Sequence, residues 1–415
     1  MESLSVVLSN AGSSTARAFS EVVKRIGISW HTQARNRAVI DIADFYTITV
    51  RLSTRFCMLV IDIAHLAFYY SLPQTHEGSD VVAIRLEELA YGVLLPVSTE
   101  LTLDRDVLEF FDRGGRAILF GEYADEFRSG RMRPDRIAEE TAERWRKTTA
   151  DLRSRAGELV IACDGDMSAV DRLHAIAPGL PTLEQAEGMS TEQLETAVSH
   201  YARLVASLGV TMLLSPTADL IGGENEWLNG RTLGDNAASV DRLVAAYVRG
   251  AERGGIQTAL KHFPGHHALM GNPATEVAIV RGSLETVLRH AGGFRAGIAA
   301  GASGVVMGSA VFEAVMPPAS ASLSQELIAL LRQEFGFTGL VITLDLDHRS
   351  AQGDNTIEHT CINALAAGAD LLLLSPSSVS NIPAITQAIA VAIDTGTLPL
   401  ARLESAFASV SAAAR

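Results

Sequence analysis

The sequence predicts an α/β protein, a (β/α)8 TIM barrel with a small N-terminal extension, on three observations. Eight short apolar segments of strand length follow one another from residue 92 onward, and segments with the 3.6-residue periodicity of helices separate them. The strands are almost continuously apolar, as a sheet buried on both faces requires. Their strict alternation with helices implies parallel pairing through right-handed crossovers. We place an α/β extension of unknown role at residues 1–84 and the barrel at residues 85–415.

The composition agrees with a globular protein and excludes some partners. The chain has 415 residues, which suffices for one large barrel and a small additional unit. A hydrophobic content of 47% and a mean hydropathy of +0.19 indicate a sizeable core. The 48 acidic and 34 basic residues give a net charge of −14, which repels nucleic acids and anionic lipids. We therefore expect a small-molecule ligand, with no nucleic-acid or membrane partner.

The cysteines and the N-terminus favour a cytoplasmic protein. The three cysteines are odd in number, widely spaced and without metal-binding spacing, so we expect reduced, buried thiols at Cys57, Cys163 and Cys361. The first residues, Met-Glu-Ser, lack the basic and apolar regions of a secretory signal. The apolar run 56–70 is shorter than the roughly 20 residues that span a bilayer, and we interpret it as core.

The extension begins with a predicted strand at Leu4–Leu8, a turn and a helical pattern that continues to about Arg25. Two later apolar stretches, 39–43 and 60–64, share the pentapeptide VIDIA, which is too short to establish a duplication. The role of this segment is open. One possibility is that residues 1–84 form the contact of a homodimer.

The barrel elements follow in order. The predicted strands are Gly92–Val97, Arg116–Gly121, Glu158–Cys163, Thr211–Pro216, Thr258–Phe263, Gly304–Ser309, Leu340–Asp345 and Asp370–Ser375. The predicted helices are 104–113, 133–156, 190–208, 239–253, 283–300, 323–335, 357–367, 381–394 and 400–412. Ser190 and Ser322 or Ser324 supply helix start signals at two of these segments.

Polar residues follow most of these strands directly. In a parallel barrel the functional site lies at the carboxyl ends of the strands, so these residues share one rim. They are Asp164 and Asp166, the segment Asp219–Arg231, the segment Lys261–His267, Ser309, the segment Asp345–His348, and Ser375.

Residues 261–266, KHFPGH, resemble the signature of family 3 glycoside hydrolases, especially the single-domain bacterial β-N-acetylglucosaminidases. Further segments resemble other motifs of that family in the same order. They are ACDGDMSAVDRL (162–173), SPTADL (215–220), NGRTLGD (229–235), FRAGIAAGA (294–302), SLS (322–324) and GFTGLVIT (336–343). The resemblance covers about residues 88–412 and implies a TIM barrel that acts on sugars.

The resemblance also implies a set of sugar-binding residues. The family holds its sugar with the first Asp and the closing Arg of one motif, the Arg of another, and the Lys-His of the signature. The matching positions here are Asp164, Arg172, Arg231, Lys261 and His262. We expect His266 to be structural, and Trp227 either to cover a bound ring or to pack in its loop.

The expected catalytic positions differ from the family pattern. A retaining glycosidase needs a carboxylate nucleophile and a proton donor. Residues 343–348 read TLDLDH, which places Leu344 at the nucleophile position. A one-residue bulge would be needed to turn Asp345 inward instead. The Asp-Ser-His that supplies the family's proton donor corresponds to Asn272-Pro273-Ala274.

Three interpretations follow. The chain is a repurposed enzyme that acts on an amino-sugar-like or other small polar substrate, with Asp345, His267 and His348 as candidate acid/base groups beside Asp166. Alternatively, it is a non-catalytic sugar-binding protein, or a residual β-N-acetylhexosaminidase that uses Asp345. We favour the first. No ligand spacing indicates a metal, and we expect no cofactor.

Overall fold

The computed structural model describes residues 4–7, 30–33, 37–40, 85–169, 171–173 and 176–415. The chain divides into two compact units, Met1–Val82 and Ala83–Arg415, which are described separately. In the first, β1 (Leu4–Val7), β3 (Arg37–Ile40) and β2 (Trp30–Gln33) form an antiparallel sheet in that order. The strand predicted at Leu4–Leu8 is confirmed. The predicted helix up to Arg25, the stretch 60–64, Cys57 and most of the proposed dimer contact lie outside the described residues.

The second unit is a parallel eight-stranded barrel. Its strands are β4 (Leu94–Ser98), β5 (Ala117–Phe120), β6 (Val160–Cys163), β7 (Met212–Leu213), β8 (Gln257–Phe263), β10 (Gly304–Met307), β13 (Leu340–Thr343) and β14 (Leu372–Leu374). Neighbours along the chain pair in parallel, and β14 pairs with β4. A parallel bridge between Ile342 and Leu371 joins β13 to β14 and closes the ring. The predicted barrel and all eight of its strands are therefore confirmed.

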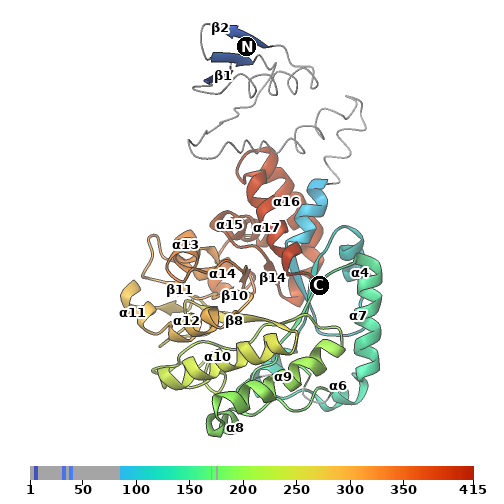
Figure 1. The fold of residues 1–415 in the computed structure, drawn as a ribbon, viewed down its shortest axis with the longest axis vertical. Helices are drawn as coiled ribbons and strands as arrows, with labels where there is room; N and C mark the ends of the chain where they lie inside the picture. The colour runs from blue at the N-terminus through green and yellow to red at the C-terminus, as the bar shows by residue number, and fades with distance from the viewer. Residues whose placement is uncertain (1–3, 8–29, 34–36, 41–84, 170, 174–175) are drawn as a thin grey trace. The chain divides into compact units, whose positions relative to one another are not determined.

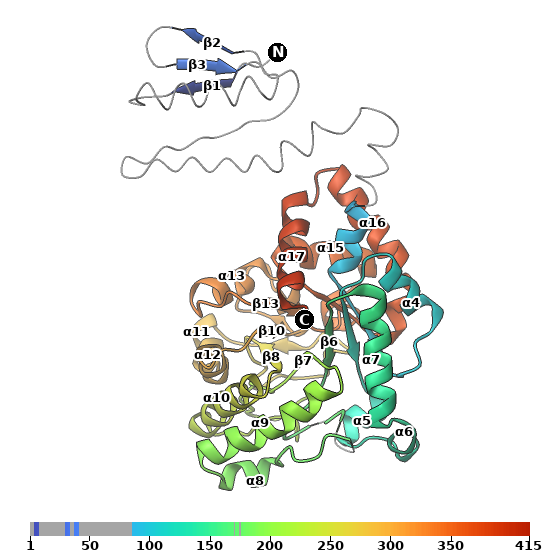
Figure 2. The same cartoon turned by 45° about the vertical axis from the view of Figure 1, so that its right-hand side comes forward.

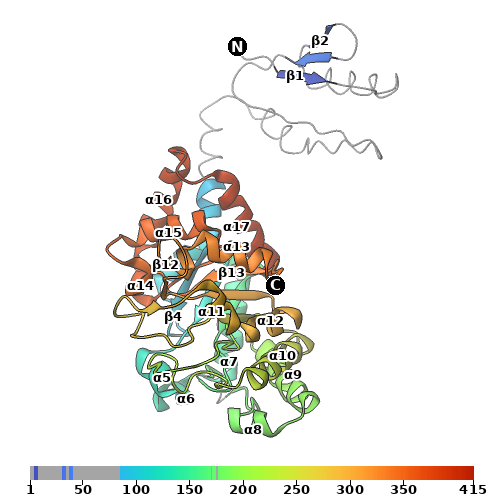
Figure 3. The ribbon, with the colours of Figure 1, turned by 90° about the vertical axis from the view of Figure 1, so that its left-hand side faces the viewer.

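Helices surround the strands (Figure 1). They include α4 (Arg105–Asp112), α6 (Pro134–Glu139), α7 (Ala142–Ala156), α9 (Thr191–Ser207), α10 (Ala237–Arg253), α11 (Leu284–Arg289), α12 (Gly292–Ala299), α13 (Gln325–Gln333), α15 (Ile357–Ala367), α16 (Ile382–Asp394) and α17 (Leu400–Ala413). Helix α10 packs against both α9 and α12. In all three views α16 lies at the opposite end of this unit from α8 (Leu183–Gly188) (Figure 2, Figure 3).

Two helices that we predicted as continuous are each divided in two. Segment 133–156 breaks at Glu140 because this side chain turns inward to Arg172, and Thr141 then caps α7 by accepting from the Arg144 N–H. Segment 283–300 breaks before Gly292. At Gly293 a Cβ atom would lie 2.6 Å from the Ala218 carbonyl oxygen, so glycine permits the close approach of α12 to the segment after β7.

Some small elements near the rim were not predicted. Strands β9 (Ile279–Val280), β11 (Val311–Phe312) and β12 (Ala319–Ser320) form a second sheet, in the order β12-β11-β9. Helices α5 (Ala124–Ser129), α8 and α14 (Arg349–Gln352) are also additional. Each is only two to six residues long, too short for a clear periodic signal.

Two of the sequence-based expectations about the chain as a whole can be checked in the described residues. Cys163 and Cys361 are buried free thiols, as predicted. No helix in the described part of the chain is both long enough and apolar enough to cross a bilayer.

Candidate functional site at the carboxyl ends of the barrel strands

Lys261, near the end of β8, is held between two carboxylates. Its Nζ forms an ion pair with Asp164 and lies 2.7 Å from Asp166 Oδ2. Asp164 and Asp166 follow β6, and Asp166 Oδ1 also accepts from the Thr217 N–H at 2.9 Å. Burial alone would lower the pKa of Lys261, but the two carboxylates outweigh it and raise that pKa above its usual range. The lysine is therefore a fixed cation, and an ammonium group has three N–H donors, of which the carboxylates take two.

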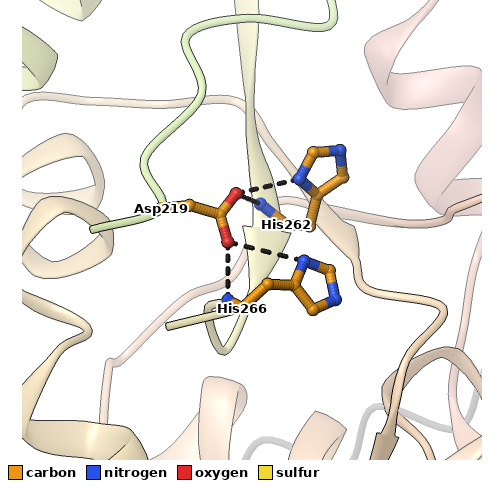
Figure 4. A group of neighbouring side chains, drawn as sticks. All are labelled: Asp219, His262 and His266. Atoms are coloured by element: carbon orange, nitrogen blue, oxygen red, sulfur yellow. Dashed lines mark hydrogen bonds and ion pairs between the residues drawn. The ribbon is translucent and has the colours of Figure 1, made fainter. Parts of the chain in front are cut away.

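A second network fixes the signature loop (Figure 4). Asp219 Oδ2 accepts from both the backbone N–H and the ring Nδ1 of His262, each at 2.8 Å. Asp219 Oδ1 accepts from the His266 N–H at 2.7 Å and lies 3.5 Å from the His266 ring Nδ1. Burial lowers the pKa of both histidines, that of His266 to about 3, so both rings are neutral at pH 7.

These three side chains are also the group of metal-ligand type found among the described residues, with their ligand atoms within 4.8 Å of one another. Both oxygens of Asp219 already accept hydrogen bonds from this loop. A cation would have to displace those bonds, so we interpret the group as an internal network that shapes the end of β8, with His266 in the structural role expected of it.

The loop after β7 covers the histidines. Trp227 packs against the rings of His262 and His266, with centroid distances of 4.8 Å and 4.9 Å. Asn225 fastens this loop by donating to the His266 carbonyl at 2.6 Å. The guanidinium of Arg231 lies 5.2 Å from the Trp227 ring centroid, and the residue is half-buried. Burial lowers the pKa of Arg231, against the opposing effect of Asp219, Asp166 and Asp164. Arg231 therefore belongs to the same charged group as Lys261.

Arg172 is engaged in a different way. Its guanidinium binds both carboxylate oxygens of Glu140, at 2.5 Å and 2.8 Å, and its Nε donates to the Gly121 carbonyl. Both side chains are buried. A bidentate, buried pair of this kind fixes the loop after β6 to α6 and β5 and leaves little of the guanidinium for a ligand. The role of Arg172 in sugar binding stays a prediction.

Two further candidate residues, Asp345 and His348, lie together after β13. Their Oδ2 and Nε2 atoms are 3.6 Å apart, and each side chain is about one-fifth exposed. On the other side of the ring, His348 Nδ1 lies 3.2 Å from the hydroxyl of Ser309, which is fully buried after β10. Burial raises the pKa of Asp345, partly offset by His348. The buried serine therefore orients the histidine, whereas the side chains of Asp345 and His348 are both partly exposed.

His267 is placed on another side of the loop. Its Nδ1 lies 3.1 Å from the Leu220 carbonyl, and its ring stacks on His290 with centroids 3.6 Å apart. The ring also lies against Gly222, where an added Cβ would come within 2.0 Å of it. These contacts separate its environment from that of the Asp345–His348 pair, and its catalytic role stays a prediction without support from its position.

The loop after β8 is attached to the segment that carries His348. The backbone N–H groups of Arg349 and Ser350 donate to the carbonyls of Ala274 and Pro273. The Ser350 hydroxyl bridges Glu276 O and Ala278 N. Pro273 and Ala274 are thus part of the support of the segment that carries His348.

With this geometry established, comparison with known proteins identifies the family. The model of the "Glycosyl hydrolase family 3 N terminal domain" matches residues 127–413, and this chain belongs to that family. It is 30% identical over 232 residues to a beta-hexosaminidase of Xylella fastidiosa (strain 9a5c), covering 54% of this chain and 69% of the relative. It is 25% identical over 262 residues to the beta-hexosaminidase LpqI of Mycobacterium tuberculosis, covering 61% and 67%. The resemblance derived from KHFPGH is confirmed.

Solved structures agree on the fold. A β-N-acetylhexosaminidase from Beutenbergia cavernae superposes with a TM-score of 0.66 at 22% identity, covering 79% of this chain and 98% of that one. A family 3 β-N-acetylglucosaminidase from Paenibacillus superposes with a TM-score of 0.70 at 24% identity, covering 79% and 62%.

Sequence reasoning missed two carboxyl groups at this rim. Glu140 lies within a predicted helix, and nothing in the sequence marks it as the partner of Arg172. Glu122 directly follows the second predicted strand, Arg116–Gly121, so the rule that located Asp164 would also have located Glu122.

Proposed function

We propose that this chain is a repurposed family 3 enzyme that acts on a hexosamine-like sugar without forming a glycosyl-enzyme ester. The observation that carries the proposal is the Asp345–His348 pair, with its 3.6 Å separation, at the same rim as the Lys261 group.

In this proposal the sugar hydroxyls bind among Lys261, Asp164 and Arg231. A hydroxyl both donates and accepts, so it pairs with a carboxylate and with the remaining N–H of the lysine. Trp227 closes the pocket behind His262. The names of the relatives, beta-hexosaminidases, support an amino sugar as the ligand.

The Asp345–His348 pair supplies proton transfer. Burial raises the pKa of Asp345, partly offset by His348, so this carboxyl keeps its proton to a higher pH than an exposed carboxyl does. The Ser309 hydroxyl can donate to, or accept from, His348 Nδ1 and therefore suits either tautomer. The pair can thus protonate a leaving group or take a proton from water, and general acid–base catalysis contributes about 10² to 10⁴ in rate.

Leu344 is the reason why the proposed reaction differs from the retaining mechanism through a glycosyl-enzyme ester. The Leu344 side chain is buried, and an alkyl group forms no ester with a sugar. A direct displacement by water remains available: the oxygen of water bonds to the sugar carbon as the bond to the leaving group breaks, and the Asp345–His348 pair takes a proton from the water and returns one to the leaving group.

The test is product analysis by mass spectrometry in ¹⁸O-labelled water, with N-acetylhexosaminides and other amino-sugar derivatives as substrates. We expect a product that contains one labelled oxygen, and a loss of about 100-fold in kcat in Asp345→Asn and His348→Gln. The exposed residues Asp354 and His359 provide matched controls, Asp354→Asn and His359→Gln, which should retain activity. Full activity in Asp345→Asn would contradict the proposed role.

The second candidate function is non-catalytic sugar binding, and the buried Leu344 is the observation that favours it. Calorimetry with N-acetylglucosamine and muramyl sugars separates the two. Binding of a sugar that yields no product under any condition supports the binding protein, whereas turnover of the bound sugar supports the enzyme. Residual β-N-acetylhexosaminidase activity through Asp345 would appear as release of the aglycone that is lost in Asp345→Asn.

A further inference from the structure

Glu122 is a carboxyl group at this rim that the proposed reaction does not use. It lies two residues beyond β5, and its Oε1 is buried without a hydrogen-bond partner among the described residues. The residue as a whole is only half-buried, so the carboxyl lies at the border between the interior and the rim. A dry carboxyl oxygen without a partner is costly, and native structures keep few of them.

The strand register places Glu122 beside the sugar-binding group. Phe120 of β5 pairs with Cys163 of β6, so Gly121 is level with Asp164 and Glu122 comes one residue further, at the ends of two neighbouring strands that lie about 5 Å apart. The Gly121 carbonyl, next to Glu122, accepts from the side chain of Arg172. Glu122 therefore follows the end of β5, next to the strand end that carries Asp164, and both Asp164 and Lys261 are close enough to act on its charge.

The neighbouring cations do not neutralise Glu122. Arg172 is bound to Glu140, and Arg136 to Glu126 and Glu140. Lys261 is shared by Asp164 and Asp166. Each nearby positive charge thus already has a carboxylate, and Glu122 is left as an additional acid.

The electrostatics agree with this geometry. Burial and the neighbouring Asp164 raise the pKa of Glu122 well above its ordinary value, against the opposing effects of Arg172, Lys261 and Arg136. A carboxyl group in this state offers both a donor and an acceptor. A hydroxyl group is the ligand that pairs with both its neutral and its ionised form, whereas an ammonium group lacks an acceptor.

We infer that Glu122 is a specificity-determining residue that binds a hydroxyl group of the sugar beside Asp164. Two neighbouring carboxyl groups suit two hydroxyls on adjacent sugar carbons. This inference rests on the proposed function, because it assumes a sugar in this pocket.

The first test is a thermodynamic cycle by calorimetry. The wild type and Glu122→Met, a substitution of similar volume, are titrated with N-acetylglucosamine and with its single-deoxy analogues. We expect Glu122→Met to weaken binding of the parent sugar about tenfold. For the wild type, one deoxy analogue should bind about tenfold more weakly than N-acetylglucosamine. For Glu122→Met, that same analogue and N-acetylglucosamine should bind equally well. Glu184→Met, on the exposed surface of α8, is the matched control and should bind like the wild type.

The outcomes separate this inference from the proposed function. Two results overturn the inference alone. In the first, Glu122→Met binds the parent sugar as tightly as the wild type does. In the second, each deoxy analogue loses the same affinity, relative to the parent sugar, in the variant and in the wild type. Absence of sugar binding by the wild type overturns the proposed function, and the inference with it.

A second test needs no ligand. Glu126, four residues along the chain, accepts from the N–H groups of Tyr123 and Arg133 at 2.9 Å and 2.8 Å and pairs with Arg136. We expect Glu126→Gln to lower Tm by several degrees and Glu122→Met to leave Tm unchanged or raise it, because a ligand-binding carboxyl lacks partners in the free protein. A fall in Tm of equal size for both variants would show that Glu122 is structural and would overturn the inference.

Discussion

Asp219 Oδ2 lies 2.8 Å from both the backbone N and the ring Nδ1 of His262, so a single carboxylate oxygen fixes the main chain and the side chain of one residue. The other oxygen fixes the backbone of His266 four residues later. Burial alone would raise the pKa of Asp219, but these donors outweigh it and hold its pKa below the usual range. The end of β8, and with it Lys261, depends on this carboxylate.

Replacement of Asp219 should therefore affect both folding and binding. Asp219→Ala leaves two backbone N–H groups and a ring N–H buried without an acceptor, which costs about 1 to 3 kcal/mol for each donor that water cannot reach. We expect the free energy of unfolding in urea to fall by at least about 3 kcal/mol. Asp354→Ala, at an exposed ion pair, is the control and should change it little. Equal stability of the two variants would contradict the assigned role of Asp219.

The buried histidine at position 266 should make the fold sensitive to acid. Its pKa is lowered from 6.5 to about 3 in the folded protein, so the unfolded chain binds more protons between these values. Stability is therefore fully present above about pH 6.5 and is lost as pH falls toward 3. We expect the unfolding free energy of the wild type to decline by several kcal/mol over this range, measured by urea titration, and that of His266→Phe to decline less steeply. Parallel curves would show that other groups cause the acid sensitivity.

The two arginines of the predicted sugar-binding set should respond differently to the same change. Arg172 makes a buried bidentate pair with Glu140, whereas Arg231 is half-buried beside Trp227. Lysine cannot reproduce a bidentate contact. We expect Arg172→Lys to lower stability by about 2 kcal/mol or more with a small change in sugar affinity. For Arg231→Lys we expect the reverse, with affinity about tenfold weaker and Tm nearly unchanged.

Calorimetry and thermal unfolding of the same two preparations provide the comparison. A loss of affinity in Arg172→Lys larger than that in Arg231→Lys would return Arg172 to the sugar-binding set that the family motif implies.

The barrel follows from the sequence because its signal is repeated. Each buried strand, such as Val160–Cys163, is a short apolar run between amphipathic segments, and eight repetitions leave few alternative topologies. The helix break at Glu140 was not predictable, because it depends on a side chain turning toward Arg172, 32 residues later.

The site is predictable in part for the same reason. The rule that polar residues follow strands located Lys261, Asp164 and Asp345, which the barrel brings to one rim. It does not say which neighbours pair. The contact of His348 with Ser309 and the stacking of His267 on His290 depend on loop conformation, for which the sequence carries no periodic signal.

Glu122 should make the stability of the protein fall as the pH rises above about 4.5. Its pKa in the folded protein is well above the ordinary value of 4.5, because of burial and Asp164 and despite Arg172, Lys261 and Arg136. The native state therefore retains a proton that the unfolded chain has lost, and stability falls as pH rises from about 4.5 through the folded pKa. Glu122→Gln removes this titration. We expect the stability of the variant relative to the wild type to be greater at about pH 8 than at about pH 5, in urea titrations at both values. A difference between variant and wild type that stays constant with pH would mean that Glu122 titrates normally, because only a group whose pKa differs between the folded and unfolded states makes that difference depend on pH.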